Sequence, residues 1–160
     1  MARDTQRTLA AKDLQRERLE RAIEILLARY PYLIAPELSR PKRQVWISDK
    51  DRVDLFFVTE KDVMIAEIKC QPCSMISVRQ LMRYIHIESA KQPSRKVSGV
   101  LIGPRLTPRG SETLESSSLD IRFLQLEVDI PSSVFICRDC RRAYGSRLDS
   151  CPRCQCRQVI

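Results

Sequence analysis

The 160-residue sequence contains only four glycines, one histidine and no long apolar run. So few glycines argue against a linker-rich or low-complexity protein. No stretch approaches the roughly 18 apolar residues that a membrane-spanning helix requires. The N-terminal sequence mixes both charge signs and lacks the apolar core of a signal peptide. These absences argue against a membrane or secreted protein, and we expect a cytoplasmic one.

The scarcity of histidine bears on catalysis. The single histidine, His86, follows Ile85 in a predicted helix and has no evident partner for nucleophilic catalysis. We therefore expect it to face solvent or to pack. With 43% apolar and 30% charged residues, the chain is suited to one ordinary domain with a small appendage.

Positive charge and cysteine are abundant by comparison. The formal net charge of +8 favours a polyanionic partner. Half of it lies in residues 137–160, which contain six arginines and only two aspartates. Seven cysteines, an odd number, fit poorly with a disulfide framework. In a reducing compartment, clustered cysteines more often hold a metal ion.

The order of predicted elements indicates a mixed sheet. Helices are predicted at 15–30, 77–88 and 107–117, and strands at 43–47, 52–58, 63–70, 96–102 and 120–126. The long crossover after Lys69 can bring in a parallel strand, so we predict an α/β fold with helices flanking a mixed sheet. The predicted segments are a polar arm (1–15), a main domain (16–127), a linker (128–133) and a cysteine-rich tail (134–160).

The hairpin RVDLFFVTEKDVMIAEIKC carries charges that a buried sheet should exclude. Side chains alternate across a strand, so Glu67 and Lys69 share one face. If the turn pairs Val58 with Val63, Asp54 lies directly opposite Glu67. Two opposed carboxylates repel each other unless a cation lies between them, and a divalent Mg²⁺ or Mn²⁺ ion would satisfy both. The alternative is an ordinary salt-bridged hairpin with its charged face in water.

The helix after the hairpin favours the first interpretation. It places Gln80 and Tyr84 one turn apart, beside its apolar stripe. An amide and a phenol at those positions can lean over the charged ends of the strands. The other strand positions are apolar, unlike those of a solvated face.

The combined pattern RVDLFFV, AEIK and RQLMRYI resembles the core of the PD-(D/E)xK nuclease superfamily. It is most similar to NucS-type endonucleases, which carry a D…ExK…QLxRY signature, and the resemblance covers roughly residues 19–126. It implies a restriction-endonuclease-like fold. It also implies an enzyme that hydrolyses phosphodiester bonds in DNA with Mg²⁺ or Mn²⁺.

The resemblance assigns roles to the residues that match the signature. Asp54 and Glu67 become metal ligands, and Lys69 orients or activates the attacking water. Gln80 supports the site, and Tyr84 matches the tyrosine of the signature.

The superfamily usually adds an acidic residue from the first helix. Glu24, seven residues before Pro31, is our choice, and Glu20 is the rival. The alternative for either residue is an exposed helix carboxylate.

The tail contains two CxxC motifs, CRDC and CPRC, separated by ten residues. Each motif lets two thiolates reach one ion, and two motifs complete a tetrahedral site. The segment resembles a zinc ribbon. We therefore predict a structural Zn²⁺ held by Cys137, Cys140, Cys151 and Cys154.

The arginines of the tail are candidate phosphate contacts, and we expect the ribbon to aid DNA binding. These residues are Arg138, Arg141, Arg142, Arg147 and Arg153, with Arg157 beyond them. A stabilising clip or a protein-docking module is the alternative role for the ribbon.

A third CxxC, at Cys70 and Cys73, has only Cys156 left to join it, which is one cysteine short of an iron–sulfur cluster. We expect Cys70 to pack as a small hydrophobe. Cys156 is predicted to be spare, or to exchange with Cys154.

Two other functions compete with the nuclease. One is a catalytically inactive nuclease-fold protein that binds DNA or assembles a larger DNA-processing complex. The other makes the ribbon primary, as in a transcription or RNA-processing factor. NucS-type enzymes also have an N-terminal DNA-binding and dimerisation domain, for which fewer than about 45 residues are present here. The superfamily often works as dimers, so a homodimer is a further expectation.

Overall fold

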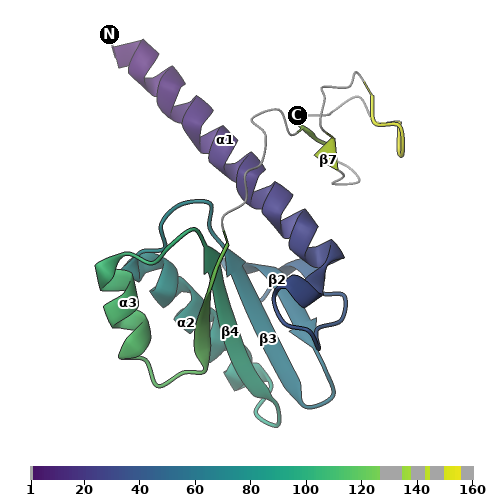
Figure 1. Ribbon diagram of the computed structural model, residues 1–160, viewed down its shortest axis with the longest axis vertical. Coiled ribbons are helices and arrows are strands. Elements are labelled where there is room, and N and C mark those ends of the chain that lie inside the picture. The colour runs from purple at the N-terminus through teal and green to yellow at the C-terminus, as the bar shows by residue number, and fades with distance from the viewer. Residues whose placement is uncertain (1, 127–134, 138–142, 145–149, 156–160) are drawn as a thin grey trace. The chain divides into compact units, whose positions relative to one another are not determined.

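The computed structural model describes residues 2–126, 135–137, 143–144 and 150–155 (Figure 1). These residues fall into two compact units. One is Leu27–Glu127, and the other consists of the described residues before and after it. No helix in the described part of the chain is long and apolar enough to cross a membrane.

The chain opens with helix α1 (Ala2–Arg29), followed by the 3₁₀ helix η1 (Pro31–Leu33). The helix begins well before Gln15, so it includes residues for which the sequence predicted a polar arm. These early residues are mostly alanine, arginine, lysine, glutamine and leucine, which favour a helix even without an apolar stripe. Pro31 ends α1 as predicted, because proline lacks an N–H and its ring clashes with the preceding turn.

Five strands form one sheet in the order β1-β2-β3-β4-β5. β1 (Lys42–Trp46), β2 (Arg52–Val58) and β3 (Asp62–Ile68) are antiparallel neighbours. β4 (Lys96–Gly103) lies parallel to β3, and β5 (Ile121–Gln125) lies parallel to β4. The predicted α/β fold with a mixed sheet is confirmed.

Two helices make the parallel connections. Helix α2 (Met75–Lys91) joins β3 to β4, and α3 (Pro108–Glu115) joins β4 to β5. Each begins at a hydroxyl cap: Ser74 Oγ accepts the N–H of Ile76, and Thr107 Oγ1 accepts the N–H of Gly110. Apart from α1, every predicted element of this unit has the right type, with ends that differ by at most three residues.

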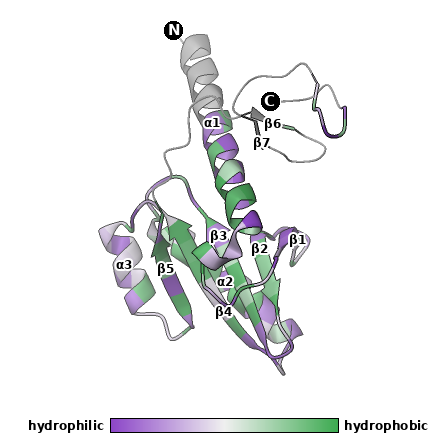
Figure 2. Cartoon of the chain, turned by 45° about the vertical axis from the view of Figure 1, so that its right-hand side comes forward, coloured by the Kyte–Doolittle hydropathy of each residue, from purple (hydrophilic) through white to green (hydrophobic). Residues whose placement is uncertain are grey.

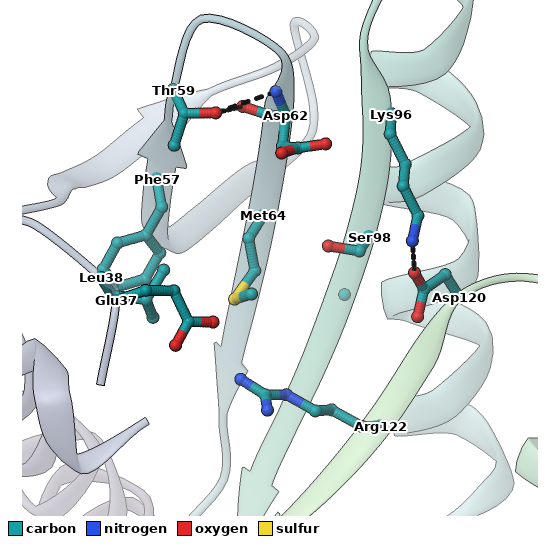
Figure 3. A pocket seen from close by; sticks show the side chains of 11 residues that line it. Glu37, Leu38, Phe57, Thr59, Asp62, Met64, Lys96, Ser98, Asp120 and Arg122 are labelled. Carbon is teal, nitrogen blue, oxygen red and sulfur yellow. Dashed lines mark hydrogen bonds and ion pairs between the residues drawn. The ribbon is translucent and has the colours of Figure 1, made fainter. Parts of the chain in front are cut away.

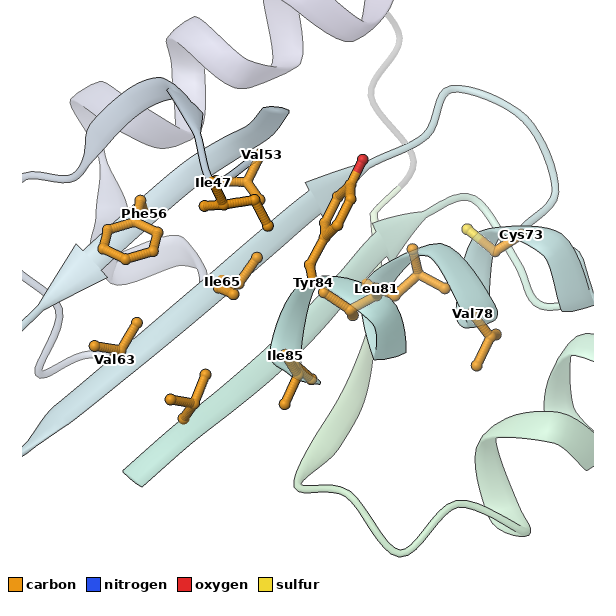
Figure 4. Close-up of a cluster of buried hydrophobic side chains, with 12 residues drawn as sticks. Ile47, Val53, Phe56, Val63, Ile65, Cys73, Val78, Leu81, Tyr84 and Ile85 are labelled. Atoms are coloured by element: carbon orange, nitrogen blue, oxygen red, sulfur yellow. The ribbon is translucent and has the colours of Figure 1, made fainter. Parts of the chain in front are cut away.

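The core of this unit lies between α2 and one face of the sheet (Figure 4). The strands contribute apolar residues at alternate positions, such as Val63 and Ile65 on β3. Coloured by hydropathy, the central strands are among the most hydrophobic parts of the chain (Figure 2). Helix α2 contributes a stripe at helical spacing that consists of Val78, Leu81, Tyr84 and Ile85.

Gly99 on β4 allows α2 to pack closely against the sheet. A β-carbon at this position would lie 2.7 Å from Ile85 Cδ1 and 3.1 Å from the Leu81 δ-carbons. The absence of a side chain at Gly99 therefore allows α2 to lie close to β4. The position of α2 matters for the site because this helix also carries Gln80 and Tyr84.

The described tail residues contain a two-stranded antiparallel sheet, β6 (Phe135–Ile136) and β7 (Ala143–Tyr144). These strands lie on either side of the first CxxC motif, whereas the sequence placed a hairpin or loop between the two motifs, and the ribbon stays a prediction. The predicted linker, 128–133, lies outside the described residues.

The turn between β1 and β2 is tied to α2 through Asp51. Its carboxylate accepts hydrogen bonds from Ser48 Oγ at 2.9 Å and from Arg83 Nε and Nη2 at 3.1 and 2.5 Å. The Ser48 hydrogen bond, together with the Arg83 guanidinium, holds the pKa of Asp51 below its usual value.

We expect Asp51→Asn to lower the free energy of unfolding by about 1 kcal/mol at neutral pH, a small effect because solvent screens the exposed Arg83. A carboxyl whose pKa is lower in the folded state stabilises the fold above its unfolded pKa, near 3.8. That stabilisation is lost as the pH falls through the folded value. Urea unfolding of both proteins should therefore show a smaller difference near pH 3 than near pH 7. An equal difference at both pH values would contradict this role.

Candidate active site and cysteine cluster

The β2–β3 hairpin brings the two predicted acidic residues together. Its register pairs Leu55 with Ala66, and one step further along it places Asp54 opposite Glu67. The predicted register is confirmed. Both residues belong to the face of the sheet that α2 covers, because each is two positions from a core residue of that face, Phe56 on β2 and Ile65 on β3.

Lys69 joins this pair just beyond the end of β3. Its Nζ lies 2.8 Å from Glu67 Oε1. Its backbone N–H donates to the carbonyl of Ile102 on β4, which anchors the residue. Glu67 is only 3% exposed, and a carboxylate removed from water to that extent needs a cationic partner. The Lys69 side chain is 24% exposed, so it is less buried than the carboxylate that it contacts.

Asp54 is held at both carboxylate oxygens. Oδ2 accepts a hydrogen bond from the backbone N–H of Ile68 at 2.9 Å, and Oδ1 accepts one from Gln44 Nε2 at 3.0 Å. The Ile68 N–H lies beyond the last pair of the β2–β3 ladder, so the Asp54 side chain takes the place of a strand partner there. A carboxylate oxygen can accept more than one hydrogen bond or ligand, so these two contacts do not by themselves prevent Asp54 from binding an ion.

Helix α2 supplies Gln80 and Tyr84, which contact each other. Gln80 Nε2 donates to the Tyr84 hydroxyl at 2.5 Å. Tyr84 is buried in the core. Its hydroxyl points out of the apolar cluster and lies near the end of β3 (Figure 4). Since the hydroxyl oxygen accepts from Gln80, its own proton is available for donation.

The electrostatics of Tyr84 connect it to the acidic pair. Burial raises the pKa of Tyr84, the hydrogen bond from Gln80 opposes this, and the negative charge of Glu67 raises it further. The field of Lys69 acts in the opposite direction. Tyr84 therefore stays protonated at neutral pH beside Glu67 and Lys69, and the sequence-predicted residues of β2, β3 and α2 form one group.

The donor atoms of this group fit a hard divalent cation. Asp54 and Glu67 offer carboxylate oxygens from adjacent strands of a rigid sheet, and oxygen ligands are those that Mg²⁺ and Mn²⁺ prefer. Lys69 is the partly exposed member of the group, with 24% of its side chain accessible. The donor set is therefore suited to hold such an ion.

Glu24 lies on α1, among residues of the other compact unit. It is 2% exposed, and its Oε2 accepts a hydrogen bond from Arg21 Nη1 at 2.7 Å. Its rival Glu20 is only half-buried. Glu24 is therefore not an exposed helix carboxylate, and its catalytic role stays a prediction.

Gln44 contacts the site although nothing in the sequence pointed to it. It lies on β1 opposite Asp54, between the pairs Arg43–Leu55 and Val45–Val53. Its φ of 52° is in the left-handed region, which a glutamine rarely adopts. A sequence motif does not reveal such a backbone, because glycine and asparagine are the residues that usually mark it.

The single histidine and the cysteines of the third CxxC motif lie outside the group around Asp54 and Glu67. His86 is exposed, in agreement with the solvent-facing interpretation. Cys73 is fully buried, and its Sγ would lie 2.6 Å from a β-carbon on Gly103. Cys70 is half-buried, so its role as a packing residue stays a prediction, whereas Cys73 is the fully buried cysteine of this motif.

Three of the four predicted zinc ligands form a cluster. The Sγ atoms of Cys137, Cys151 and Cys154 lie within 4.8 Å of one another, and those of Cys137 and Cys154 are 3.5 Å apart. Sulfur atoms on a tetrahedral Zn²⁺ at about 2.3 Å are about 3.8 Å apart, so the spacing fits one ion. Cys140 and Cys156 lie outside the described residues.

The second CxxC motif forms a tight turn. Gln155, directly after Cys154, has a left-handed φ of 58°, and its N–H donates to the Cys151 carbonyl at 2.7 Å. This turn places two thiols on the same side of the chain. Arg153, within the turn, is exposed. The other tail arginines, Arg138, Arg141, Arg142, Arg147 and Arg157, lie outside the described residues.

A separate pocket lies at the other end of the strands, on the face away from α2 (Figure 3). It has a volume of about 320 Å³ and is lined by side chains that include Met64, Ser98 and Arg122. Lys96 and Asp120 form an ion pair at its edge. Neither Asp54 nor Glu67 lines this pocket, so it is not the predicted active site.

The chain is similar to solved nuclease structures. It is 26% identical to a chain of the EndoMS-dsDNA2 complex (TM-score 0.55), with 64% of this chain and 43% of that chain covered. It is also 26% identical to a repair endonuclease from Pyrococcus abyssi (TM-score 0.54; 64% and 45% covered). EndoMS in its apo form, at 23% identity and a TM-score of 0.55, shows the same fold over 68% of this chain and 47% of that one.

The chain thus matches less than half the length of these proteins. No curated protein matches it. One family model, the endonuclease NucS C-terminal domain, matches residues 19–140, which is well over half of the chain. That range contains the hairpin carboxylates, Lys69 and the Gln80–Tyr84 pair. The chain belongs to the endonuclease NucS C-terminal domain family.

Proposed function

We propose that this protein is a metal-dependent endonuclease that hydrolyses phosphodiester bonds in DNA. The observation that carries the proposal is the opposed pair Asp54 and Glu67 with Lys69 bonded to it. Membership of a nuclease domain family and likeness to structures described as endonucleases support the same function.

In this proposal Asp54 and Glu67 hold a Mg²⁺ or Mn²⁺ ion. Such an ion, when bound, lowers the pKa of a coordinated water and polarises a phosphoryl oxygen. The hydrogen bonds to both oxygens of Asp54 keep its carboxylate in one orientation. Glu67, buried and bonded to Lys69, is similarly restrained. Restraint of this kind places ligands before the substrate arrives.

Lys69 has two functions in the proposed reaction. Its ammonium offsets the repulsion between the carboxylates while the substrate is absent. Because it is partly exposed, it can also orient the attacking water and stabilise negative charge that develops on the phosphate. Gln80 keeps Tyr84 in place, and the Tyr84 proton can be donated to a phosphate or water oxygen.

We further propose that the tail is a zinc ribbon and that it aids DNA binding. The three clustered thiols, two of them fully buried, support a structural Zn²⁺ that Cys140 completes. The excess of arginine in residues 137–160 supports contact with phosphates.

The function is tested by incubating the purified chain with supercoiled plasmid, branched DNA and single-stranded DNA, each with Mn²⁺ and with EDTA. We expect at least one substrate to be cleaved with Mn²⁺ and none with EDTA. Binding without cleavage of any substrate would instead identify an inactive DNA-binding subunit. Cleavage that persists in EDTA would contradict a divalent-metal mechanism.

The DNA-binding role of the ribbon predicts a particular salt dependence. Replacing Arg141 and Arg142 by glutamate should weaken binding to all DNA sequences alike, because phosphate contacts carry no sequence information. Each lost contact should also flatten the slope of log affinity against log salt by roughly one unit. Fluorescence anisotropy titrations at several salt concentrations measure the slope. An unchanged slope would favour the docking or clip alternatives.

A further inference from the structure

We infer that Gln44 is a positioning residue that holds the Asp54 carboxylate in its ligand geometry. The inference rests on the proposed function, because Asp54 is its metal ligand. Gln44 Nε2 donates to Asp54 Oδ1 at 3.0 Å, across the β1–β2 pair. The Ile68 N–H donates to Oδ2 at 2.9 Å, so each carboxylate oxygen accepts a hydrogen bond.

Two hydrogen-bond donors on different oxygens restrain a carboxylate more than a single donor does. A single hydrogen bond leaves a carboxylate able to rotate about its Cβ–Cγ bond. The second donor binds the other oxygen and comes from the strand on the other side of β2. Together the two donors fix the plane of the carboxylate. Gln44 thus holds Asp54 through a side-chain hydrogen bond, as Lys69 holds Glu67.

The backbone of Gln44 supports a functional reason for this contact. The strand pairs on either side of Gln44 share one register, so no residue is inserted at this point. Yet Gln44, alone among the described strand residues, adopts a left-handed φ of 52°. For a residue with a β-carbon this costs about 1 kcal/mol or more. Conformations of this kind persist mainly where the surrounding structure or a function requires them.

Two substitutions separate the amide from the backbone. Gln44→Gly removes the amide and relieves the strain, so the protein should unfold at the same or a higher temperature. Gln44→Met removes the amide but retains the side-chain length and the strain, so it should be no more stable than wild type. The matched control is Gln125→Gly, which removes an exposed glutamine from β5 at the opposite edge of the sheet.

Manganese binding without DNA gives the readout. Electron paramagnetic resonance of free Mn²⁺ measures the dissociation constant of each variant. We expect Gln44→Gly and Gln44→Met to raise it about 10- to 100-fold, the range for loss of a partner that orients a metal ligand. Gln125→Gly should bind as wild type does. A merely structural role would make affinity follow stability, whereas both Gln44 variants should weaken binding although only one retains the strain.

Wild-type affinity in both Gln44 variants would overturn the inference, as would weakening in Gln44→Met alone. Failure of the wild type to bind Mn²⁺ would overturn it as well. The outcome is distinct from that of the nuclease proposal. A wild type that cleaves no DNA but binds Mn²⁺, with affinity that depends on Gln44, would remove the nuclease and leave the positioning role. A wild type that cleaves, with all variants equal in affinity, would remove only the role of Gln44.

Discussion

Asp54→Asn and Glu67→Gln are each expected to reduce DNA cleavage by more than about 100-fold. Loss of a residue that only orients a metal ligand costs up to about that much, and these variants lose the proposed ligand itself. Each change removes one negative charge and one carboxylate ligand while keeping the shape of the side chain. In Asp54→Asn, the new amide oxygen can still accept from the Ile68 N–H. Gln44 can turn its own amide to offer an acceptor to the new NH₂ group. The fold should therefore survive both changes.

The matched control is Asp62→Asn, at the opposite end of the same hairpin. Its carboxylate lines the separate pocket rather than the proposed site, so cleavage should stay at the wild-type rate. Initial rates on the substrate found for the wild type, together with thermal unfolding in EDTA, separate chemistry from stability. Removing one of the opposed charges should leave the unfolding temperature in EDTA unchanged or raise it, since like charges repel. Wild-type cleavage by either active-site variant would end the assignment of Asp54 and Glu67.

Loss of the cysteine cluster should have the second large effect. Cys137→Ser and Cys151→Ser each remove a buried thiol, and each variant should lose the single Zn²⁺ expected per chain. Binding of structural zinc to small fingers contributes on the order of 10–16 kcal/mol to their folding, so the tail should unfold without it. Elemental analysis gives the metal content. Limited proteolysis should show new cleavage in the last 30 or so residues.

Cys70→Ser is the control for this experiment, because Cys70 does not belong to the cluster. That variant should retain its zinc and resist proteolysis as the wild type does. Iron in place of zinc, or full zinc content in Cys137→Ser, would show that the cysteines are grouped differently.

Most of the fold could be predicted from the sequence because its patterns are local. The alternation along RVDLFFV and VMIAEIK, joined by a four-residue turn, determines the β2–β3 register, and that register places Asp54 opposite Glu67. The apolar stripe of α2 likewise predicts which face packs on the sheet. The start of α1 could not be predicted this way. Its first residues have helix propensity but little apolar periodicity.

The site was predictable only in part, for a related reason. Residues with a charge in an apolar strand stand out, so Asp54, Glu67 and Lys69 can be found from the sequence. Gln44 does not stand out, because its contact depends on a backbone angle that a glutamine rarely adopts. The burial of Glu24 depends on tertiary packing, and the sequence alone could not separate it from Glu20.

The left-handed residue in β1 also affects solubility. In the described part of the chain, β1 is an edge strand that pairs only with β2, so its outer row of N–H and C=O groups is a template for another molecule's strand. Gln44 interrupts that row, and Lys42 and Arg43 place positive charge beside the interruption. A foreign strand therefore meets a break and two cations before it can form a continuous ladder. We therefore expect the residue that orients Asp54 also to disfavour edge-to-edge pairing of the sheet.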